Sequence, residues 1–539
     1  MMMVADDGGG GGGGYYPVSE AVVQAAEEDP LQPMPVIITF KAPPTQEQLD
    51  QLAALGADVA VLLEGGNAVS AVMSAGDAAS LASDKSVSAV GVDAPMVAML
   101  DVGRRAIGHT HLPRPLDGLT GAGITIAVLD SGIDNHPDLN NRILARVDII
   151  NQMSEAKASN EVLKTGSDDF VNSGEIAMPL LEEESATRSS SASVSYDPFG
   201  HGTHIAGIIA ADGSGSRGDY QGVAPGARLV DVRVLDANGG GTVAGVTAGI
   251  EWIIRNRDMY GIRVISMSLG HAPLEPADLD PLVLAVERAW DAGIVVFCSA
   301  GNFGTYGNWT ITSPGNSQRV ITVGSVTDWN TNKTGDDMVS SYSSRGPALT
   351  GTLKPDFVAP GNRIIATRSP GSYLDSTYPE WRVTHGASRD PLYFELSGTS
   401  MATPMAAASA ALMLEADPSL TPDNIKARMM LGADAGLAGH PLDHGAGAFD
   451  LEAALKDRSR IDYAPSPMLV RNEDVEGHIC LEDVAKLWDY PPLYDSTIWG
   501  DSTLWTDSTL WADSTIWGDS TIWGDSTIWG DSTIWGDST

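Results

Sequence analysis

The sequence Ile-Thr-Ile-Ala-Val-Leu-Asp-Ser-Gly at residues 124–132 decides the fold that this chain of 539 residues is expected to adopt. Its first six residues form a largely apolar run of strand length, which is typical of a strand buried on both faces of a parallel sheet. Asp130 then stands at the carboxyl end of that strand, where open α/β sheets place ligands and chemistry. We therefore expect a mostly parallel sheet with Asp130 at its functional edge.

Two later segments supply the groups that work with a carboxylate in acyl transfer. His-Gly-Thr-His at residues 201–204 precedes small and apolar residues that favour a helix, and Ser-Gly-Thr-Ser-Met-Ala at residues 397–402 opens an Ala-rich helix. A serine hydroxyl needs an adjacent base to become a nucleophile, and the base needs a buried carboxylate that fixes its tautomer. Asp130, His201 and Ser400 provide these groups in the chain order Asp-His-Ser.

Each segment has a plainer interpretation when it is taken alone. Asp-Ser-Gly is common where a strand ends in a turn, and the segment around Ser400 can cap a helix N-terminus. His201 and His204 are three residues apart, as a metal pair on a helix can be, but the neighbouring sequence offers no third ligand for zinc. The joint occurrence of the three segments in this order favours the catalytic interpretation.

A fourth segment, Ser-Ala-Gly-Asn at residues 299–302, follows another apolar run of strand length. Acyl transfer requires preorganised hydrogen-bond donors where the negative charge of the tetrahedral intermediate develops. The side-chain amide of Asn302 and the backbone N–H of Ser400 are candidates for these donors. Taken alone, Asn302 is also a common type of turn residue.

These four segments resemble the signature segments of the subtilisin-like serine peptidases, the subtilase family, and the similarity extends from about residue 108 to about residue 455. The resemblance implies a three-layer α/β/α domain with a mostly parallel sheet and the activity of a serine endopeptidase. Ser400 would attack the scissile carbonyl to form an acyl-enzyme, His201 would transfer the proton, Asp130 would orient His201, and Asn302 would stabilise the oxyanion. No cofactor is implied for the chemistry.

The resemblance also implies a set of substrate-binding residues for polypeptide substrates. They lie on two facing strands and beside the oxyanion segment: Ser268, Leu269, Gly270, Gly239, Gly240, Gly241, Ser299, Ala300 and Gly301. The glycines would let a peptide backbone approach and pair as an added strand, although an ordinary flexible loop is the alternative for residues 239–241.

Asp138 matches a calcium ligand of the family, so structural calcium is a possibility. The loop that normally completes that site is replaced here by residues 212–218. Calcium takes six to eight oxygen ligands, and Asp138 is the one good candidate that the sequence offers. Calcium binding therefore stays open at this stage.

Upstream, residues 34–100 predict a small α+β unit with strands at 36–40, 59–63, 68–73 and 87–92 and helices at 45–55 and 75–83. This order is that of a split β-α-β unit with ferredoxin-like packing, and it resembles the propeptide inhibitor of subtilisins. The resemblance implies that the unit inhibits the peptidase domain, residues 101–457, and is removed by a cut between residues 94 and 105. A permanent regulatory or binding domain is the alternative.

The remaining segments are of low complexity or unusual composition. Residues 1–33 are expected to be a Gly-rich N-terminus without a visible secretory signal, and residues 154–194 an acidic surface loop open to self-cleavage. Residues 458–494 are expected to be a linker. Residues 495–539 repeat Asp-Ser-Thr-Ile-Trp-Gly with small variations, which predicts either a disordered tail or self- and surface association through β-type stacking.

The net charge of −38, from 32 Lys and Arg against 70 Asp and Glu, argues against nucleic acid or an anionic membrane surface as a partner. The sequence contains no apolar run long enough for a transmembrane segment. The family resemblance implies a secreted or cell-surface location. The alternative function is that of a surface-associated or scaffold protein whose peptidase domain acts only in self-processing.

Overall fold

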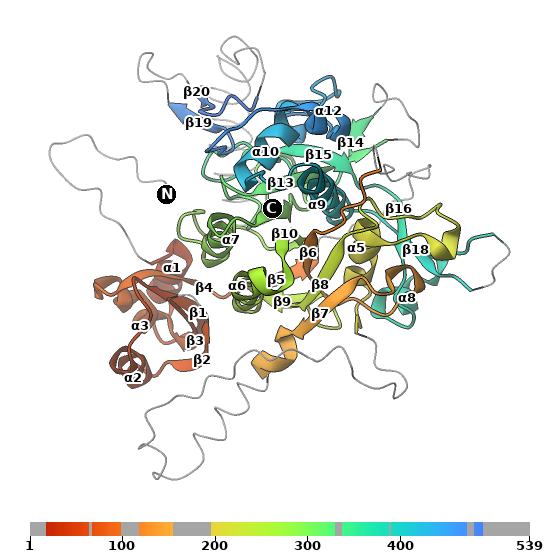
Figure 1. The fold of residues 1–539 in the computed structure, drawn as a ribbon. Helices are drawn as coiled ribbons and strands as arrows, with labels where there is room; N and C mark the ends of the chain where they lie inside the picture. Colours follow the sequence, from red (N-terminus) through yellow and green to blue (C-terminus); the bar gives the residue numbers. More distant parts are fainter. Residues whose placement is uncertain are drawn as a thin grey trace.

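The computed structural model describes residues 18–63, 67–98, 118–154, 196–328, 337–386, 390–471 and 479–488. A large unit is built around a mostly parallel sheet, and a smaller N-terminal unit lies beside it (Figure 1). The Gly-rich start of the chain, most of the expected acidic loop and the tryptophan repeats lie outside these described residues.

The large sheet has the strand order β14-β13-β12-β10-β6-β8-β7, and β15 pairs with β13. Its strands are β6 (Thr125–Asp130), β7 (Ile143–Asp148), β8 (Arg228–Arg233), β10 (Ile262–Met267), β12 (Val295–Ser299), β13 (Ile321–Thr327), β14 (Met338–Val339) and β15 (Phe357–Pro360). All of these pairings are parallel except that of β13 with β14. Every residue of β6 is buried, as the apolar run predicted, and the mostly parallel α/β sheet is confirmed.

Two pairs of helices cover this sheet. Helix α5 (His201–Ala210) packs against α9 (Thr399–Ala416), and α9 also contacts β10, β12 and β13. Helix α6 (Val243–Tyr260) packs against α7 (Pro281–Asp291) and contacts β6, β8 and β10. Small residues let α9 lie deep in the molecule, where every residue from Thr399 to Leu414 is buried. The sheet and its helices therefore form α, β and α layers (Figure 1).

Shorter elements surround this core. A three-stranded sheet has the order β16-β18-β17. Its strands and the other short elements of the large unit are η2 (Pro137–Leu139), η3 (Ser214–Ser216), η4 (Gly304–Tyr306), β16 (Ile364–Thr367), α8 (Tyr373–Thr377), η6 (Pro379–Trp381), β17 (Arg382–Val383), β18 (Tyr393–Leu396), α10 (Pro422–Leu431), α11 (Pro441–His444) and α12 (Leu451–Lys456).

The N-terminal unit contains a four-stranded antiparallel sheet with the order β2-β3-β1-β4. Its elements are β1 (Pro33–Phe40), α2 (Gln46–Ala54), β2 (Asp58–Leu63), β3 (Ala68–Ser74), α3 (Ala75–Ser80), η1 (Leu81–Ser83) and β4 (Val87–Val92). Each strand and helix predicted between residues 36 and 92 therefore has a counterpart at nearly the same residues.

One expectation for this unit needs correction, because a helix precedes β1. Helix α1 (Glu20–Glu28) lies within the stretch assigned to a low-complexity terminus, and Ser19 caps it by accepting a hydrogen bond from the N–H of Val22. Val18 and Val22 are buried in the core of the N-terminal unit. Val22, Ala25 and Ala26 follow helical spacing, a signal that the glycine run before them obscured.

After β4 the chain enters the large unit as strand β5 (Pro95–Ala98). This strand pairs antiparallel with both β9 (Gly240–Thr242) and β11 (Leu269–Gly270), so the order is β11-β5-β9. Just before it, Asp93 Oδ1 accepts a hydrogen bond of 2.9 Å from the N–H of Ala244, at the start of α6. The N-terminal unit is thus joined to the large unit by a strand and by a helix cap.

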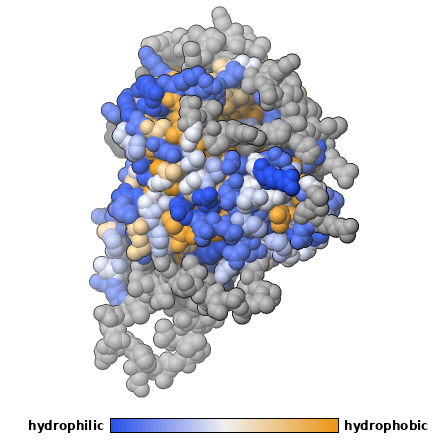
Figure 2. Space-filling model, turned by 45° about the vertical axis from the view of Figure 1, so that its right-hand side comes forward, coloured by the Kyte–Doolittle hydropathy of each residue, from blue (hydrophilic) through white to orange (hydrophobic). Residues whose placement is uncertain are grey.

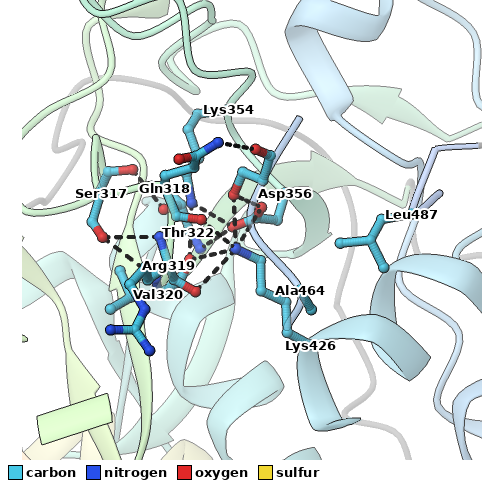
Figure 3. Close-up of polar contacts among 12 residues, drawn as sticks. Ser317, Gln318, Arg319, Val320, Thr322, Lys354, Asp356, Lys426, Ala464 and Leu487 are labelled. Atoms are coloured by element: carbon cyan, nitrogen blue, oxygen red, sulfur yellow. Dashed lines mark hydrogen bonds and ion pairs between the residues drawn. The ribbon is translucent and has the colours of Figure 1, made fainter. Parts of the chain in front are cut away.

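The expected linker at residues 458–494 also needs correction over its described residues, because they pack on the large unit. Ala464, Ser466 and Leu487 are buried, and β19 (Met468–Arg471) pairs with β20 (Ile479–Glu482). The reason is a buried polar cluster in which Lys354 and Lys426 point toward Asp356 (Figure 3). Ser466 Oγ lies 2.8 Å from Lys426 Nζ and donates to Asp356 Oδ1 at 2.6 Å. Buried charges need such partners, which ties the segment down.

The described part of the surface is predominantly hydrophilic on the face in Figure 2, with apolar residues in patches between the polar ones. Among the described residues, no helix has the length and apolar character needed to cross a membrane.

Candidate active site

Asp130 and His201 form a buried pair at the edge of the sheet. Asp130 is the last residue of β6 and His201 the first residue of α5. His201 Nδ1 lies 2.8 Å from Asp130 Oδ1 and 2.9 Å from Oδ2. A carboxylate can only accept here, so Nδ1 carries the proton and Nε2 is the basic nitrogen. His201 Nε2 is buried and has no hydrogen-bond partner among the described residues.

Ser400 lies in the first turn of α9, the helix that packs against α5. It is fully buried, and its hydroxyl donates to the carbonyl oxygen of Ser268 at 3.1 Å. Ser268 Oγ donates in return to the carbonyl oxygen of Ser400 at 2.9 Å. The positive N-terminal end of α9 favours negative charge beside Ser400, as expected for a residue next to a developing oxyanion.

The side chain of Asn302 is held with its amide nitrogen free. Asn302 Oδ1 accepts hydrogen bonds of 3.0 Å from both the N–H and the hydroxyl of Thr399, the residue before Ser400. Two donors at this atom identify it as the oxygen. Asn302 Nδ2 is buried and lacks a hydrogen-bond partner in the described parts of the chain. A buried donor without a partner, on a side chain held by the residue before Ser400, is suited to receiving an oxyanion.

The expected substrate-binding residues lie around the edge strands β9 and β11. Val97 of β5 is opposite both Gly240 and Gly270, and Ala98 is opposite Leu269. The N–H of Ala98 donates to the carbonyl of Gly239 at 3.2 Å. The two strands therefore already accept an extended segment of this chain between them, in the antiparallel geometry of an added strand.

The oxyanion segment at residues 299–301 lies next to this arrangement. Ser299 Oγ donates to the carbonyl of Leu269 at 3.5 Å, and the N–H of Ala300 donates to the carbonyl of Val323 at 3.0 Å. Gly301 has a φ of 106°, and a Cβ there would lie 2.7 Å from both Ser344 Oγ and Thr312 Cγ2. A glycine is therefore required where the chain turns toward Asn302.

Asp138 does not fit a calcium ion. It is fully buried, and its Oδ1 accepts hydrogen bonds from the N–H of Gly215 at 2.7 Å and the hydroxyl of Ser214 at 3.2 Å. The hydroxyl of Tyr393 donates to Oδ2 at 2.8 Å. These groups turn hydrogen atoms toward the carboxylate, whereas calcium needs oxygen lone pairs. Across the described residues, no group of three or more His, Cys, Asp or Glu side chains could hold a metal ion.

His204 has a structural role that excludes the metal-pair interpretation. Its Nε2 lies 3.2 Å from the carbonyl oxygen of Ile364 and 3.0 Å from that of Phe394. Because carbonyl oxygens only accept, Nε2 carries the proton, and burial lowers the pKa of His204 to about 3. The neutral ring ties α5 to β16 and β18.

Two polar residues of the site were not identified from the sequence. Thr399 orients the amide of Asn302, and Asp197 is a fully buried carboxylate that contacts the segments around both Asp130 and His201. Asp197 lies three residues before Gly200, the N-cap of α5, and so matches no standard capping pattern that could have identified it. Thr399 had no sequence signal either, because its role depends on a residue almost one hundred positions away.

A parallel α/β sheet with a buried Asp-His pair at its edge and a serine at an adjacent helix start is the arrangement that a serine hydrolase of the α/β class requires. The subtilase family model matches residues 121–448, and the chain belongs to that family. Serine protease AprX of Bacillus subtilis is 42% identical over 360 residues, which cover 66% of this chain and 71% of that protein. Subtilisin Savinase of Lederbergia lenta is 33% identical over 339 residues, covering 63% and 93% respectively.

A solved structure of fervidolysin from Fervidobacterium pennivorans, a keratinolytic enzyme related to subtilisin, has the same fold with a TM-score of 0.56. It is 21% identical, and the match covers 82% of this chain and 63% of that one. Together with the family match, the named relatives identify this chain as a subtilisin-like serine protease.

Proposed function

We propose that this protein is a serine endopeptidase that acts through Asp130, His201 and Ser400 and is made as a self-processing zymogen. The observation that carries the catalytic assignment is the buried Asp130–His201 pair, whose free Nε2 belongs to a helix packed against the one that holds Ser400 in its first turn. A neutral imidazole with its proton fixed on Nδ1 is a general base at Nε2.

In the proposed reaction, the Ser400 hydroxyl turns from the Ser268 carbonyl toward His201 Nε2 and attacks the scissile carbonyl carbon. His201 takes the hydroxyl proton, and the Asp130 carboxylate stabilises the imidazolium that forms. The oxyanion accepts hydrogen bonds from Asn302 Nδ2 and the backbone N–H of Ser400. His201 then protonates the leaving amine, and water hydrolyses the acyl-enzyme with the same base.

The substrate class that fits is an extended polypeptide. A peptide that pairs between β9 and β11 gains backbone hydrogen bonds on both sides whatever its side chains are, and alternate side chains point into the enzyme. Strand β5 illustrates this alternation, because Met96 is fully buried whereas Val97 is 46% exposed. Endopeptidase rather than exopeptidase activity is favoured, since the paired segment Pro95–Ala98 lies inside the chain and includes neither chain terminus.

The zymogen part of the proposal is supported by the same strand. β5 occupies the position that a substrate would take, and it directly follows the N-terminal unit. The β2-β3-β1-β4 order supports a ferredoxin-like propeptide inhibitor. Ala98 is opposite Leu269, one residue after the Ser268 whose carbonyl binds the Ser400 hydroxyl. We therefore expect self-cleavage within about two residues after Ala98, given a rise of roughly 3.4 Å per strand residue.

Replacing the proposed nucleophile, Ser400, tests both the catalytic assignment and the self-processing. Ser400→Ala should abolish peptide hydrolysis and leave the chain uncut, because both reactions use the same hydroxyl. Peptide hydrolysis assays and mass spectrometry of the chain termini measure the two outcomes. Ser409→Ala is the matched control, since Ser409 is a buried serine of the same helix whose hydroxyl donates to the carbonyl of Met405. Hydrolysis by a purified Ser400→Ala chain would contradict the catalytic assignment.

We also propose a location outside the cell or at its surface. The support is the family resemblance, together with an acidic composition that keeps a protein soluble. Fractionation of the producing cells, with activity measured in the medium, on the surface and in the lysate, tests this location.

A further inference from the structure

Asp197 is a buried carboxylate that the reaction scheme leaves without a role. It is fully buried and stands four residues before His201. Its Oδ1 accepts hydrogen bonds from the Ser131 hydroxyl at 2.8 Å and the N–H of Gly200 at 2.7 Å. Its Oδ2 accepts from the N–H and the hydroxyl of Thr203, at 2.8 and 2.7 Å. One carboxylate thus holds the residue after Asp130 and two residues that flank His201.

Ser131 links this carboxylate to Asp130. Its hydroxyl oxygen accepts the N–H of Gly202 at 3.0 Å and lies 3.2 Å from Asp130 Oδ1. A hydroxyl has one proton to donate, and the shorter distance of 2.8 Å directs it to Asp197. Asp130 Oδ1 instead accepts the backbone N–H of Ser131 at 2.8 Å. The orientation of Asp130 therefore depends on where Asp197 holds Ser131.

The end of β6 and the start of α5 are packed closely against each other. A Cβ on Gly202 would lie 2.2 Å from the carbonyl oxygen of Gly132 and 3.1 Å from Asp130 Cβ. The start of α5 thus rests directly on the end of β6. Gly200, which precedes His201, has a φ of 100° and offers no side chain that could cap the helix. The N–H groups of Gly200 and Thr203 are satisfied by Asp197 instead.

We propose that Asp197 is a positioning residue whose carboxylate fixes the end of β6 and the start of α5 relative to each other, so that Asp130 holds His201 in line with Ser400. This inference rests on the proposed function, because it takes Asp130 and His201 as the reacting pair. Displacing a catalytic group by about 1 Å can cost roughly 100-fold in rate. A carboxylate that accepts four hydrogen bonds from two segments is suited to prevent such a displacement.

Charge alone does not explain the placement of Asp197. The charged or titratable groups on the elements around it include Asp130, Asp134, Asp231, His201, His204 and Arg146. Burial raises the pKa of Asp197, and its hydrogen bonds with Thr203, Gly200 and Ser131 oppose that rise. An added negative charge in this acidic surrounding is unfavourable. The carboxylate of Asp197 therefore stabilises the site through its hydrogen bonds and not through its charge.

The test is Asp197→Asn in the full chain, because the amide keeps the size but offers one acceptor atom in place of two. The amide nitrogen would meet the N–H of Gly200 or of Thr203, where a carboxylate oxygen accepts. We expect kcat to fall by about ten- to a hundredfold while KM stays within about twofold. In an inactive Ser400→Ala background, the NMR signal of the His201 Nδ1 proton should shift, since its distance to Asp130 changes.

Asp423→Asn is the matched control. Asp423 also accepts hydrogen bonds from two separate segments, from the indole N–H of Trp290 and the N–H of Ala464, but it lies on α10, outside the site. Its kcat and the His201 signal should not change. If Asp197→Asn does not fold, Thr203→Val decides the question, because it removes the hydroxyl that donates to Asp197 and accepts the N–H of Asp134. It should lower kcat by about threefold with the same shift of the signal.

The proposal is wrong if Asp197→Asn or Thr203→Val lowers the thermal unfolding temperature but leaves kcat and the His201 signal unchanged. Asp197 would then only stabilise the fold. This outcome differs from a failure of the proposed function, in which the Ser400→Ala chain would still hydrolyse peptides.

Discussion

Two buried nitrogen atoms of the candidate active site, His201 Nε2 and Asn302 Nδ2, are among those without hydrogen-bond partners in the described residues. An unpaired buried polar atom costs about 1–3 kcal/mol, so such atoms need an explanation. In both side chains the other polar atom is held firmly, by Asp130 in one and by Thr399 in the other. Both free atoms are therefore preorganised for the roles proposed for them, His201 Nε2 as the base for the Ser400 hydroxyl and Asn302 Nδ2 as the donor to the oxyanion.

For Asn302 this leads to a kinetic prediction. Asn302→Ala should lower kcat by about two to three orders of magnitude and change KM much less, because the lost hydrogen bond forms mainly in the transition state. Steady-state kinetics on a short peptide measures both constants. Asn256→Ala, which removes an amide on α6 that bonds the carbonyl of Trp252, should leave kcat unchanged. An unaltered kcat in Asn302→Ala would make this amide a turn residue only.

Glu275 is a second residue whose surroundings have a functional consequence. It is 5% exposed, its Oε1 accepts the N–H of Val92 at 2.7 Å, and its Oε2 has no partner among the described residues. The carboxylate lies over Gly91, where a Cβ would be only 2.6 Å away. Burial under the N-terminal unit raises the pKa of Glu275 to about 8, and the nearby Asp280 adds to the rise, although the Val92 hydrogen bond opposes it.

The direction in which pH changes the docking of the N-terminal unit follows from the pKa difference of Glu275 between the docked and the released state. The docked state raises the pKa of Glu275 from about 4.5 to about 8, so docking favours the protonated carboxyl. The contact is complete below the ordinary pKa and weakens as pH rises toward about 8. We predict that the lag before self-activation shortens between about pH 5 and about pH 8, measured by peptide hydrolysis after dilution of the full chain.

The control for this prediction is Glu275→Gln, which cannot ionise and should flatten the pH dependence of the lag. The pH dependence of peptide hydrolysis by the mature enzyme is measured separately. Comparing the lag with this profile removes the contribution of the catalytic groups' own titration. A lag in Glu275→Gln that shortens with pH as in the unaltered chain would show that another group governs release.

At the scale of elements, strand β5 connects the N-terminal unit to the active site, and its two faces differ. Met96 is fully buried between the paired edge strands, whereas Val97, the next residue, is 46% exposed. Burial of a methionine side chain contributes about 1.5–3 kcal/mol, and a buried unpaired charge costs more. The alternation provides two adjacent positions in one strand that should respond differently to the same substitution.

We therefore predict that Met96→Asp weakens self-inhibition strongly and Val97→Asp hardly at all. The lag before peptide hydrolysis should shorten by more than about tenfold in Met96→Asp and stay within about twofold in Val97→Asp. The kcat of the mature enzyme should be equal in both, because β5 is no longer bound. Equal lags in the two variants would indicate that β5 does not control access to the active site.

At the scale of the whole molecule, the chain beyond residue 457 contains two segments of different character. The described residues up to 488 are packed, with Ser466 in the buried cluster of Lys354, Asp356 and Lys426. Burial would raise the pKa of Asp356, but the two lysines outweigh it and lower the pKa, while burial lowers the pKa of Lys426 to about 7. Removing a partner from such a buried ionic cluster costs about 3–5 kcal/mol.

Two truncations should separate these roles. A chain that ends at residue 494 should keep kcat/KM for a short peptide within a few-fold, because the repeats contain no Lys, Arg or His. It should lose the salt-promoted self- or surface association of the full chain, since salt screens the repulsion between the repeat aspartates. A chain that ends at residue 457 should unfold at a markedly lower temperature. Sedimentation at low and high salt and thermal unfolding measure these outcomes.

Each truncation has an outcome that would contradict its prediction. If the full chain and the chain ending at 494 are both monomeric at low and at high salt, the repeats have no role in association. A 457-residue chain as stable as the full one would mean that the cluster around Lys426 tolerates the loss of Ser466.

The sequence alone predicted most elements of the two units and named the candidate reacting groups. The apolar run at 124–129 predicted a buried strand ending at Asp130, and the strands and helices between residues 36 and 92 were predicted nearly at their observed positions. These features could be predicted because burial patterns repeat with the period of each element, and because the segments around Asp130, His201, Asn302 and Ser400 are short and continuous.

The tertiary structure alone decided which distant residues meet. The hydrogen bonds of Asp197 to Ser131, of Thr399 to Asn302 and of Val92 to Glu275 each join segments 66 or more positions apart. The packed segment around Ser466 was mistaken for a linker, and helix α1 for part of a low-complexity terminus, because both are stabilised by contacts with other elements. Periodicity reports which face of an element is buried, but not against what it is buried. Partners across the fold are chosen by packing and by the need to satisfy buried polar groups.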